Sequence, residues 1–359
     1  MKVLYDNQIF SMQQFGGISR YFYELIRILK NDIHYSLPIV FSNNHYLQNL
    51  DITTFRTFFP NHKFKGRTTI IQLFNYLLQR KFFNSDYDIF HPTYYNPYFL
   101  KYIKKKPFVL TIHDLTYEKF PVKLLQNDWT IRGKKILVEK AGQIIAVSEN
   151  TKKDIVDMLH IEPDKVRVIY HGCSLKPCYE KRMNLPDRFL LFVGERGGYK
   201  NFENLAKAFS SLLQVDNELK LVVTGRPFSP DEQFFFKSLR IEKNVIHYFT
   251  DNESLAELYS SALAFVYPSV YEGFGIPILE AFTCGCPVIL SRSSCFPEIA
   301  GNAGVYFDPF NVDSIIESIK SVMFHHSFRN ELIEKGKERS KYFSWEKTAK
   351  ETLKLYQSF

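Results

Sequence analysis

The sequence contains no long hydrophobic run and little cysteine. No stretch of its 359 residues reaches the about 18 consecutive apolar positions that a membrane-spanning helix needs, so no such helix is expected. The N-terminus, Met1–Asp6, lacks the apolar core and the cleavage site of a signal peptide, and it is typical of a short strand that ends on an acid. The five cysteines have neither the spacing of a disulfide framework nor that of a zinc site. This pattern favours free thiols in a reducing cytoplasm.

Motifs of three further functional classes are missing. No Asp-x-Asp motif stands in a suitable loop and no set of His, Cys and Glu ligands occurs, so neither a metal nor another cofactor is expected. No Gly-x-Gly-x-x-Gly follows a predicted strand with an acidic residue about 20 positions later, which argues against a dinucleotide oxidoreductase. No recognised nucleic-acid-binding module is present either.

Acidic residues are scarce in the first half of the chain. Residues 1–170 hold 24 Lys and Arg against 15 Asp and Glu, a net charge of +9, whereas residues 171–359 hold 22 against 23, a net charge of −1. The excess predicts an anionic partner, such as a phosphorylated lipid, a membrane surface or a nucleic acid, or else a solvated basic face without a partner. A nucleic acid is the least favoured of these, because the charges are spread along the sequence.

Strand-like apolar segments alternate with helical segments along the whole chain. This alternation predicts the α/β class, with parallel sheets and crossover helices. Two such series are separated by a stretch with one glycine, two prolines and no clear periodicity. We therefore predict two Rossmann-like doubly wound domains that face a cleft, with ligands outside the carboxyl ends of the strands. The expected parts are an N-terminal acceptor-side domain at 1–170, a linker at 171–187, a C-terminal donor domain at 188–340, and a final helix within 341–359 that can cross back to the first domain.

The loop after the predicted strand Leu263–Tyr267 is the most informative segment. It contains two glycines, and Pro277 suits the first turn of a helix because its missing N–H would be unpaired there anyway. The residues Gly273, Phe274, Gly275 and Ile276 should then present backbone N–H groups at a helix N-terminus. Such an arrangement binds anions and suits a diphosphate.

Two glutamates flank this predicted anion site. Glu280 falls in the first turn of the helix, where a carboxylate can accept hydrogen bonds from a ribose diol. Glu272 stands at the start of the loop and is placed to meet a sugar. Each glutamate also has a non-functional interpretation that is equally good when it is taken alone. Glu280 could simply be a carboxylate that interacts favourably with the helix dipole, and Glu272 could be a solvated loop residue. Their shared frame of strand, glycine loop, proline and helix favours the functional interpretation.

The stretch from Leu258 to Ile289, with Glu272 and Glu280 separated by seven residues, resembles the retaining glycosyltransferases of family 4. These are two-domain GT-B enzymes, and the resemblance extends over nearly the whole chain. It implies a nucleotide-sugar donor and a glycan or polyprenyl-linked oligosaccharide acceptor, with Glu272 beside the transferred sugar and Glu280 on the ribose. Similar chains often serve bacterial surface polysaccharide assembly, such as that of O-antigen, frequently as mannosyltransferases. GDP-mannose is therefore the first donor to test, and the cytoplasmic face of the inner membrane is the expected location. Another GT-B enzyme, such as an NDP-sugar epimerase, is the alternative.

A second glycine-rich loop, Val193–Asn201, carries two cations. Arg196 and Lys200 can neutralise a diphosphate and stabilise the charge that develops as it departs. The resemblance assigns donor-phosphate binding to an arginine and a lysine in this context. The Glu195–Gly198 insert departs from the usual family arrangement, which makes the Arg196 assignment less direct than that of Lys200. A lysine in a solvated loop is the alternative for Lys200.

The candidates in the first domain also follow predicted strands. Gly16 and Gly17 would let a backbone approach a ligand closely. The resemblance implies that Gly17 faces the donor phosphates and that Gly16 and Arg20 face the acceptor. A plain tight turn is the alternative. His113, which ends a strand, is a catalytic candidate that by resemblance contacts the donor sugar, and a core histidine is its alternative. His91 would form part of an acceptor-side wall.

A predicted helix over Thr68–Phe83 bears on a membrane partner. It places Ile71, Phe74 and Leu78 on one face and has Lys and Arg residues at its ends. This helix could lie on a membrane surface near a lipid-linked acceptor. It could equally pack into the core of the first domain.

Overall fold

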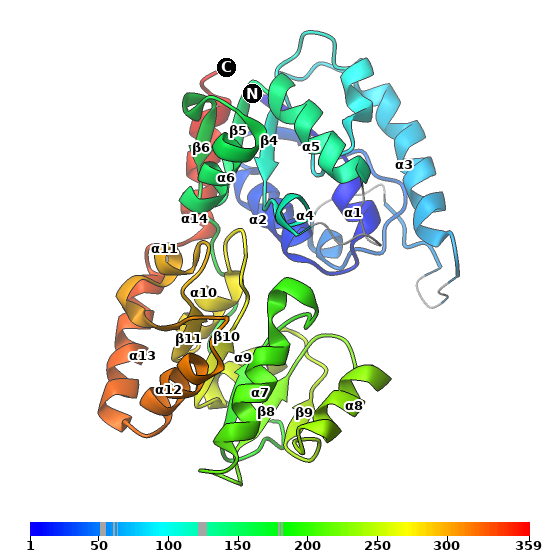
Figure 1. Cartoon of the computed structure of the whole chain (residues 1–359). Coiled ribbons are helices and arrows are strands. Elements are labelled where there is room, and N and C mark those ends of the chain that lie inside the picture. The colour runs from blue at the N-terminus through cyan, green and yellow to red at the C-terminus, as the bar shows by residue number, and fades with distance from the viewer. Residues whose placement is uncertain (51–54, 60–61, 63, 121–127, 179, 181) are drawn as a thin grey trace. The chain divides into compact units, whose positions relative to one another are not determined.

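A computed structural model describes residues 1–50, 55–59, 62, 64–120, 128–178, 180 and 182–359 of the chain. The chain divides into two compact units, of which the first comprises Met1–His171 and Trp345–Phe359 and the second comprises Gly172–Ser344. Both units are built from parallel strands connected by helices (Figure 1). The architecture is therefore α/β, as the alternating pattern predicts.

The first unit contains two three-stranded parallel sheets, with the orders β2-β1-β3 and β4-β5-β6. A single parallel bridge between Phe90 and Phe108 connects them. The strand order reverses at β1, which lies between β2 and β3, so the carboxyl ends of β1 and β3 form a topological switch point. The strands are β1 (Lys2–Tyr5), β2 (His34–Ser36), β3 (Ile89–His91), β4 (Val109–Ile112), β5 (Gln143–Ala146) and β6 (Val166–Val168).

The helices of the first unit include the C-terminal helix of the chain. Trp345, Ala349 and Tyr356 of that helix are buried in one core with Tyr5 and Tyr21, so the end of the chain belongs to the first unit, the arrangement that the sequence allowed. No helix in the described ranges is long and apolar enough to cross a membrane. The helices are α1 (Gln8–Met12), α2 (Gly17–Leu29), α3 (Arg67–Phe82), α4 (Thr116–Lys119), α5 (Asp128–Lys140), α6 (Glu149–Leu159) and α14 (Trp345–Tyr356).

The second unit has one six-stranded parallel sheet with the order β12-β11-β10-β7-β8-β9. The order reverses between β7 and β10, so the switch point of this unit lies at their carboxyl ends. Its strands are β7 (Phe189–Phe192), β8 (Lys220–Val223), β9 (Val245–His247), β10 (Ala264–Tyr267), β11 (Val288–Ser291) and β12 (Gly304–Phe307). Its helices are α7 (Phe202–Leu212), α8 (Pro230–Ser238), α9 (Asn252–Ser261), α10 (Ile276–Thr283), α11 (Phe296–Ala300), α12 (Val312–Met323) and α13 (His326–Ser340).

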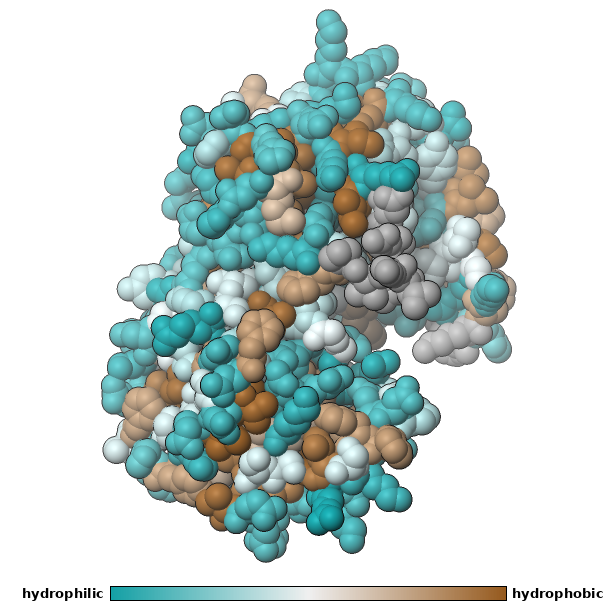
Figure 2. Space-filling model, viewed as in Figure 1, coloured by the Kyte–Doolittle hydropathy of each residue, from teal (hydrophilic) through white to brown (hydrophobic). Residues whose placement is uncertain are grey.

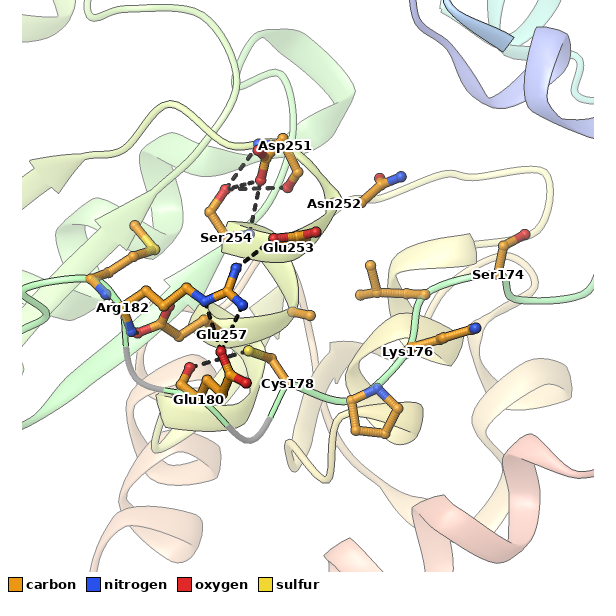
Figure 3. A pocket seen from close by; sticks show the side chains of 14 residues that line it. Ser174, Lys176, Cys178, Glu180, Arg182, Asp251, Asn252, Glu253, Ser254 and Glu257 are labelled. Atoms are coloured by element: carbon orange, nitrogen blue, oxygen red, sulfur yellow. Dashed lines mark hydrogen bonds and ion pairs between the residues drawn. The ribbon is translucent and has the colours of Figure 1, made fainter. Parts of the chain in front are cut away.

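The predicted linker, 171–187, is not a separate connection. From Gly172 onward its described residues belong to the second unit, while residues 179 and 181 lie outside the description. The buried Glu257 of α9 accepts hydrogen bonds from the backbone N–H groups of Arg182 and Met183, both at 2.9 Å. The Arg182 guanidinium also pairs with Glu180 and Glu253 (Figure 3). A cavity of about 620 Å³ lies between this segment and α9, and no predicted site residue lines it.

Candidate functional site

The loops that follow β7 and β10 meet at the switch point of the second unit. The two strands are parallel neighbours, with Ala264 opposite Leu190. Beyond their ends, the backbone N–H of Val270 donates to the carbonyl of Tyr199 at 2.8 Å. The predicted donor-binding segments are therefore brought together where open α/β sheets bind ligands.

Lys200 and Glu272 form the charged centre of this site. The Lys200 Nζ lies 2.6 Å from Glu272 Oε1, and the two side chains are 18% and 15% exposed. Tyr267, the last residue of β10, also makes a side-chain hydrogen bond to Glu272, and burial raises the pKa of its hydroxyl well above the usual value. An ammonium and a carboxylate in partial contact with water can each exchange part of this pairing for a ligand, a phosphate for Lys200 and a sugar hydroxyl for Glu272.

The backbone of Glu272 is fixed by residues that the sequence did not single out. Its N–H donates to Ser294 Oγ at 3.2 Å, and its carbonyl accepts from Ser294 Oγ at 2.5 Å and from Cys295 Sγ at 3.3 Å. Ser294 has a φ of 54°, an uncommon conformation for a residue with a side chain. The position of Tyr267 at a strand end was a usable signal, whereas nothing in the sequence pointed to Ser294.

The N-terminus of α10 has the predicted form. Gly275 precedes the helix with a φ of 89°, and a Cβ there would lie 3.1 Å from Ile278 Cδ1, so glycine is required. Within the described part of the chain, the N–H groups of Gly275 and Ile276 have no hydrogen-bond partner. These donors and the helix dipole suit an anion. The side chain of Phe274 packs against Phe343 and is buried, so Phe274 can offer a ligand only its backbone.

Glu280 lies inside α10 and is nearly buried. The hydroxyl of Tyr259 donates to its Oε2 at 3.3 Å. This contact orients the carboxylate, whose oxygens can each accept more than one hydrogen bond. Ribose binding by Glu280 stays a prediction.

Arg196 does not have the orientation that a phosphate ligand needs. Its side chain is 1% exposed, and it is paired with Glu232 at 2.8 Å. Its Nη1 donates to the carbonyl of Thr224, and its Nη2 donates to the carbonyls of Arg226 and Pro227. The predicted donor-binding role is therefore wrong for this geometry, because the guanidinium is used to fix the loop after β8.

His91 is likewise a structural residue and not part of an acceptor-side wall. The residue has no exposed surface. Its Nδ1 lies 2.6 Å from the hydroxyl of Tyr356, and its Nε2 lies 2.9 Å from Thr111 Oγ1. Burial lowers its pKa to about 3, so the ring is neutral and both nitrogens are used inside the core.

His113 follows β4 directly, as the sequence predicts. Its ring packs edge-on against Tyr21, and its Nε2 is buried without a hydrogen-bond partner in the described structure. Burial lowers its pKa to about 3, so the imidazole is neutral at pH 7. An unpaired buried nitrogen is costly, which is consistent with a contact to a ligand. The catalytic role stays a prediction.

The Gly16–Gly17 loop forms the start of α2. Gln13 Oε1 accepts from the N–H of Ser19 at 3.3 Å. A Cβ at Gly16 would overlap this side chain, whereas one at Gly17 would meet open space. Gly16 therefore makes room for Gln13, and Arg20 is buried. Neither observation supports acceptor contact by these two residues, and Gly17 stays a candidate.

No group of three or more His, Cys, Asp or Glu side chains suited to a metal ion occurs among the described residues. The site consists of one lysine, two carboxylates, a tyrosine and a helix N-terminus, all in the second unit. Gly17 and His113 belong to the first unit.

Two family models match consecutive parts of the chain. Residues 15–176 match the model described as "Glycosyltransferase Family 4" and residues 180–339 match that of "Glycosyl transferases group 1". The chain belongs to glycosyltransferase family 4. Its activity is accordingly that of a transferase, and the Lys200–Glu272 site lies in the part matched by the second model.

Curated relatives of this family 4 glycosyltransferase include O-antigen chain mannosyltransferase B of Escherichia coli. The two sequences are 28% identical over 288 residues, which cover 76% of this chain and 74% of the relative. An uncharacterized glycosyltransferase of Methanocaldococcus jannaschii is 29% identical over 296 residues, covering 75% of each sequence.

Solved structures show the GT-B fold for this family 4 chain. Sucrose-phosphate synthase from Thermosynechococcus elongatus matches with a TM-score of 0.79 at 20% identity, covering 99% of this chain and 98% of that one. Anabaena HepE in complex with UDP-glucose matches with a TM-score of 0.78 at 15% identity over the full length of both chains. At these identities the likeness concerns the fold.

Proposed function

We propose that this glycosyltransferase moves a hexose, with retention of configuration, from a nucleoside-diphosphate sugar to a hydroxyl of a glycan or lipid-linked acceptor in cell-surface polysaccharide assembly. The observation that carries the proposal is the Lys200–Glu272 pair beside the N-terminus of α10. Lys200 and the N–H groups of Gly275 and Ile276 would hold the diphosphate. Glu272 would accept hydrogen bonds from the sugar, and Glu280 from the ribose.

The donor and the pathway are inferred from the relatives. One relative is an O-antigen chain mannosyltransferase, and another, from Campylobacter jejuni, transfers N-acetylgalactosamine to a diphospho-undecaprenol glycan. A structural neighbour was solved with UDP-glucose. These names support a nucleotide-sugar donor and make GDP-mannose the first candidate. We further propose that the acceptor is met at the cytoplasmic surface of the inner membrane.

Front-face transfer fits the geometry better than a double displacement. A double displacement needs a free carboxylate nucleophile opposite the leaving group. Glu272 is instead held by Lys200 and Tyr267, which suits a fixed acceptor of sugar hydroxyls. The leaving phosphate would then take the proton of the acceptor hydroxyl. Cations and a helix N-terminus can stabilise the departing diphosphate without a metal, so we propose no metal requirement.

The proposal is tested by a thermal-shift panel of GDP, UDP, ADP and dTDP sugars, followed by a transfer assay with the stabilising donor. Glu272→Gln should lower the transfer rate by about 10²–10³-fold, because it removes a charge that interacts with the transition state. Glu195→Gln, in the neighbouring loop and largely exposed, is the matched control and should retain activity. Transfer should continue in EDTA, and the anomeric configuration of the product should match that of the donor.

Three results would contradict the proposal. One is a Glu272→Gln variant with near wild-type transfer. Another is activity that EDTA abolishes and manganese restores, which removes the metal-independent mechanism. The third is an epimerised sugar formed without an acceptor, which favours an NDP-sugar epimerase.

We also propose that α3 contacts a membrane surface. Its buried side carries Asn75 and Gln79 beside Ile71, whereas Leu73, Phe74 and Leu77 are exposed. Only part of the predicted apolar face, which includes Ile71, is therefore packed against the rest of the first unit. Hydrophobic residues are visible along the edge where α3 runs (Figure 2), and Arg67, Arg80 and Lys81 flank them. Binding to anionic vesicles should survive high salt, and loss of all binding at high salt would contradict insertion.

A further inference from the structure

A cavity of about 540 Å³ lies at the switch point of the first unit. It lies beyond the carboxyl ends of β1 and β3, and its walls come from the segments that follow these strands and from α1, α3 and α5. Its volume is in the range of small-molecule sites. It is lined by Asn7, Gln8, Met12, Thr69, Gln72, Leu73, Tyr76, Asn96, Tyr98 and Trp129.

Among the described residues, the lining contains amides, aromatic rings and the hydroxyls of Thr69, Tyr76 and Tyr98, and it has no charged side chain. The rings of Tyr76 and Tyr98 meet edge-to-face with centroids 5.3 Å apart. Within the described residues, no hydrogen-bond partner is found for the Gln72 amide, the Thr69 hydroxyl or the Asn96 Nδ2. These groups are therefore available to a ligand that has hydroxyls to pair with them.

A buried carboxylate holds part of the wall in place. Asp6 Oδ2 accepts from Gln8 Nε2 at 2.6 Å and from the Tyr98 hydroxyl at 3.4 Å. Gln8 in turn pairs with both backbone groups of Asn96, at 2.8 and 3.2 Å. Asp6 has no exposed surface and does not line the cavity, so the cavity presents polar groups that are fixed before a ligand arrives.

We propose that this cavity binds a neutral saccharide unit of the acceptor. Polar groups that fix orientation, set among aromatic and aliphatic surface, are the usual composition of a site for a small organic ligand. Because the described lining residues include no cation, we assign the cavity to a saccharide unit and not to the diphosphate of a lipid-linked acceptor. Calling the ligand an acceptor rests on the proposed function, whereas saccharide binding does not.

Direct binding measurements test the assignment. The probes are neutral disaccharides (mannobiose, maltose, lactose, cellobiose and chitobiose), with inorganic pyrophosphate and farnesyl phosphate for comparison. The readout is tryptophan emission, because Trp129 lines the cavity and only Trp345 lies elsewhere. Trp129→Phe defines the background signal. At least one disaccharide should change the emission of the wild type, and neither phosphate should compete with it.

Two substitutions and one control locate the site. Gln72→Ala should weaken disaccharide binding about tenfold through loss of a hydrogen bond, and Tyr76→Ala should weaken it at least as much. Gln48→Ala, on the exposed surface of the same unit, should have no effect. Donor hydrolysis without an acceptor should be unchanged in Gln48→Ala.

The inference is overturned if no disaccharide binds, if Gln72→Ala and Tyr76→Ala both bind as the wild type does, or if farnesyl phosphate or pyrophosphate binds in preference. Disaccharide binding without sugar transfer from any donor of the panel would instead contradict the proposed function and leave the saccharide site standing.

Discussion

The two switch points present different chemistry to a ligand. In the second unit, Lys200 and Glu272 pair at 2.6 Å beside the open N-terminus of a helix. In the first unit, amides and aromatic rings surround a cavity whose described lining residues carry no charge. The same position in two related sheets thus suits a charged ligand in one unit and a neutral ligand in the other. This difference follows from the side chains that the loops carry, since the fold sets only the location.

The net charge of the two halves does not predict this difference. The first half carries the whole positive excess of the chain, +9 against −1, and the sequence led us to expect an anionic partner there. The cavity of that half is nevertheless uncharged, and Arg67, Arg80 and Lys81 lie at the ends of α3. Overall charge therefore bears on surface association, while the ligand of a pocket depends on its lining.

The sharpest way to test the second switch point is to compare its two predicted cations. Arg196→Ala should lower the free energy of unfolding by about 3 kcal/mol, because it leaves Glu232 and three carbonyls without their partner. Donor affinity per folded molecule should change little. Denaturant titration of the second unit, together with calorimetric binding of GDP and UDP, measures both quantities.

Lys200→Ala should act mainly on donor binding and less on stability, the opposite of Arg196→Ala. Its largest effect, on the free energy of nucleotide binding, should be smaller than the loss of unfolding free energy in Arg196→Ala. Nucleoside-diphosphate affinity should fall about tenfold to fiftyfold through loss of one charge-assisted contact. Stability should fall less than in Arg196→Ala, because Lys200 loses one ion pair whereas Arg196 loses an ion pair and three hydrogen bonds to carbonyls. Arg226→Ala, a half-exposed arginine on the neighbouring loop, is the control. The comparison fails if Arg196→Ala weakens GDP binding more than Lys200→Ala does.

A smaller effect concerns the pH dependence of stability in the first unit. Burial lowers the pKa of His91 and His113 to about 3, so the unfolded chain binds more protons than the folded one below pH 6.5. The stability of the first unit should therefore fall as the pH is lowered from 6.5 toward 3. Asp6 opposes this trend, because burial raises its pKa.

Tryptophan emission follows the first unit alone, since Trp129 and Trp345 both belong to it. Denaturant midpoints measured by emission at pH 7 and pH 5 should differ, with the lower midpoint at pH 5. A midpoint that is independent of pH over this window would show that the two imidazoles are not buried and neutral.

The sequence predicted the fold well, for local reasons. The final helix expected within 341–359 lies at Trp345–Tyr356 as α14, and the predicted strand Leu263–Tyr267 differs from β10 by one residue. The glycines and the proline after β10 together determine the loop and the start of α10. Because parallel strands end at one edge, loops that are distant in sequence could be expected to bring Lys200 and Glu272 together.

The incorrect assignments concern the direction of a side chain. Arg196 turns toward Glu232, 36 residues away, and His91 bonds Tyr356, 265 residues away. Neither partner is marked by a local motif. Residue type and spacing identify a loop as functional, but long-range packing decides which of its side chains face a ligand.

Hydrogen–deuterium exchange with two ligands tests the central claim most directly. GDP or UDP should slow exchange in residues 194–201 and 268–280, around the Lys200–Glu272 pair. The bound disaccharide should slow exchange in residues 6–12, 67–76 and 96–100, around the cavity of the first unit. Protection of the same segments by both ligands, or nucleotide protection in the first unit only, would contradict the division between a charged and a neutral switch point.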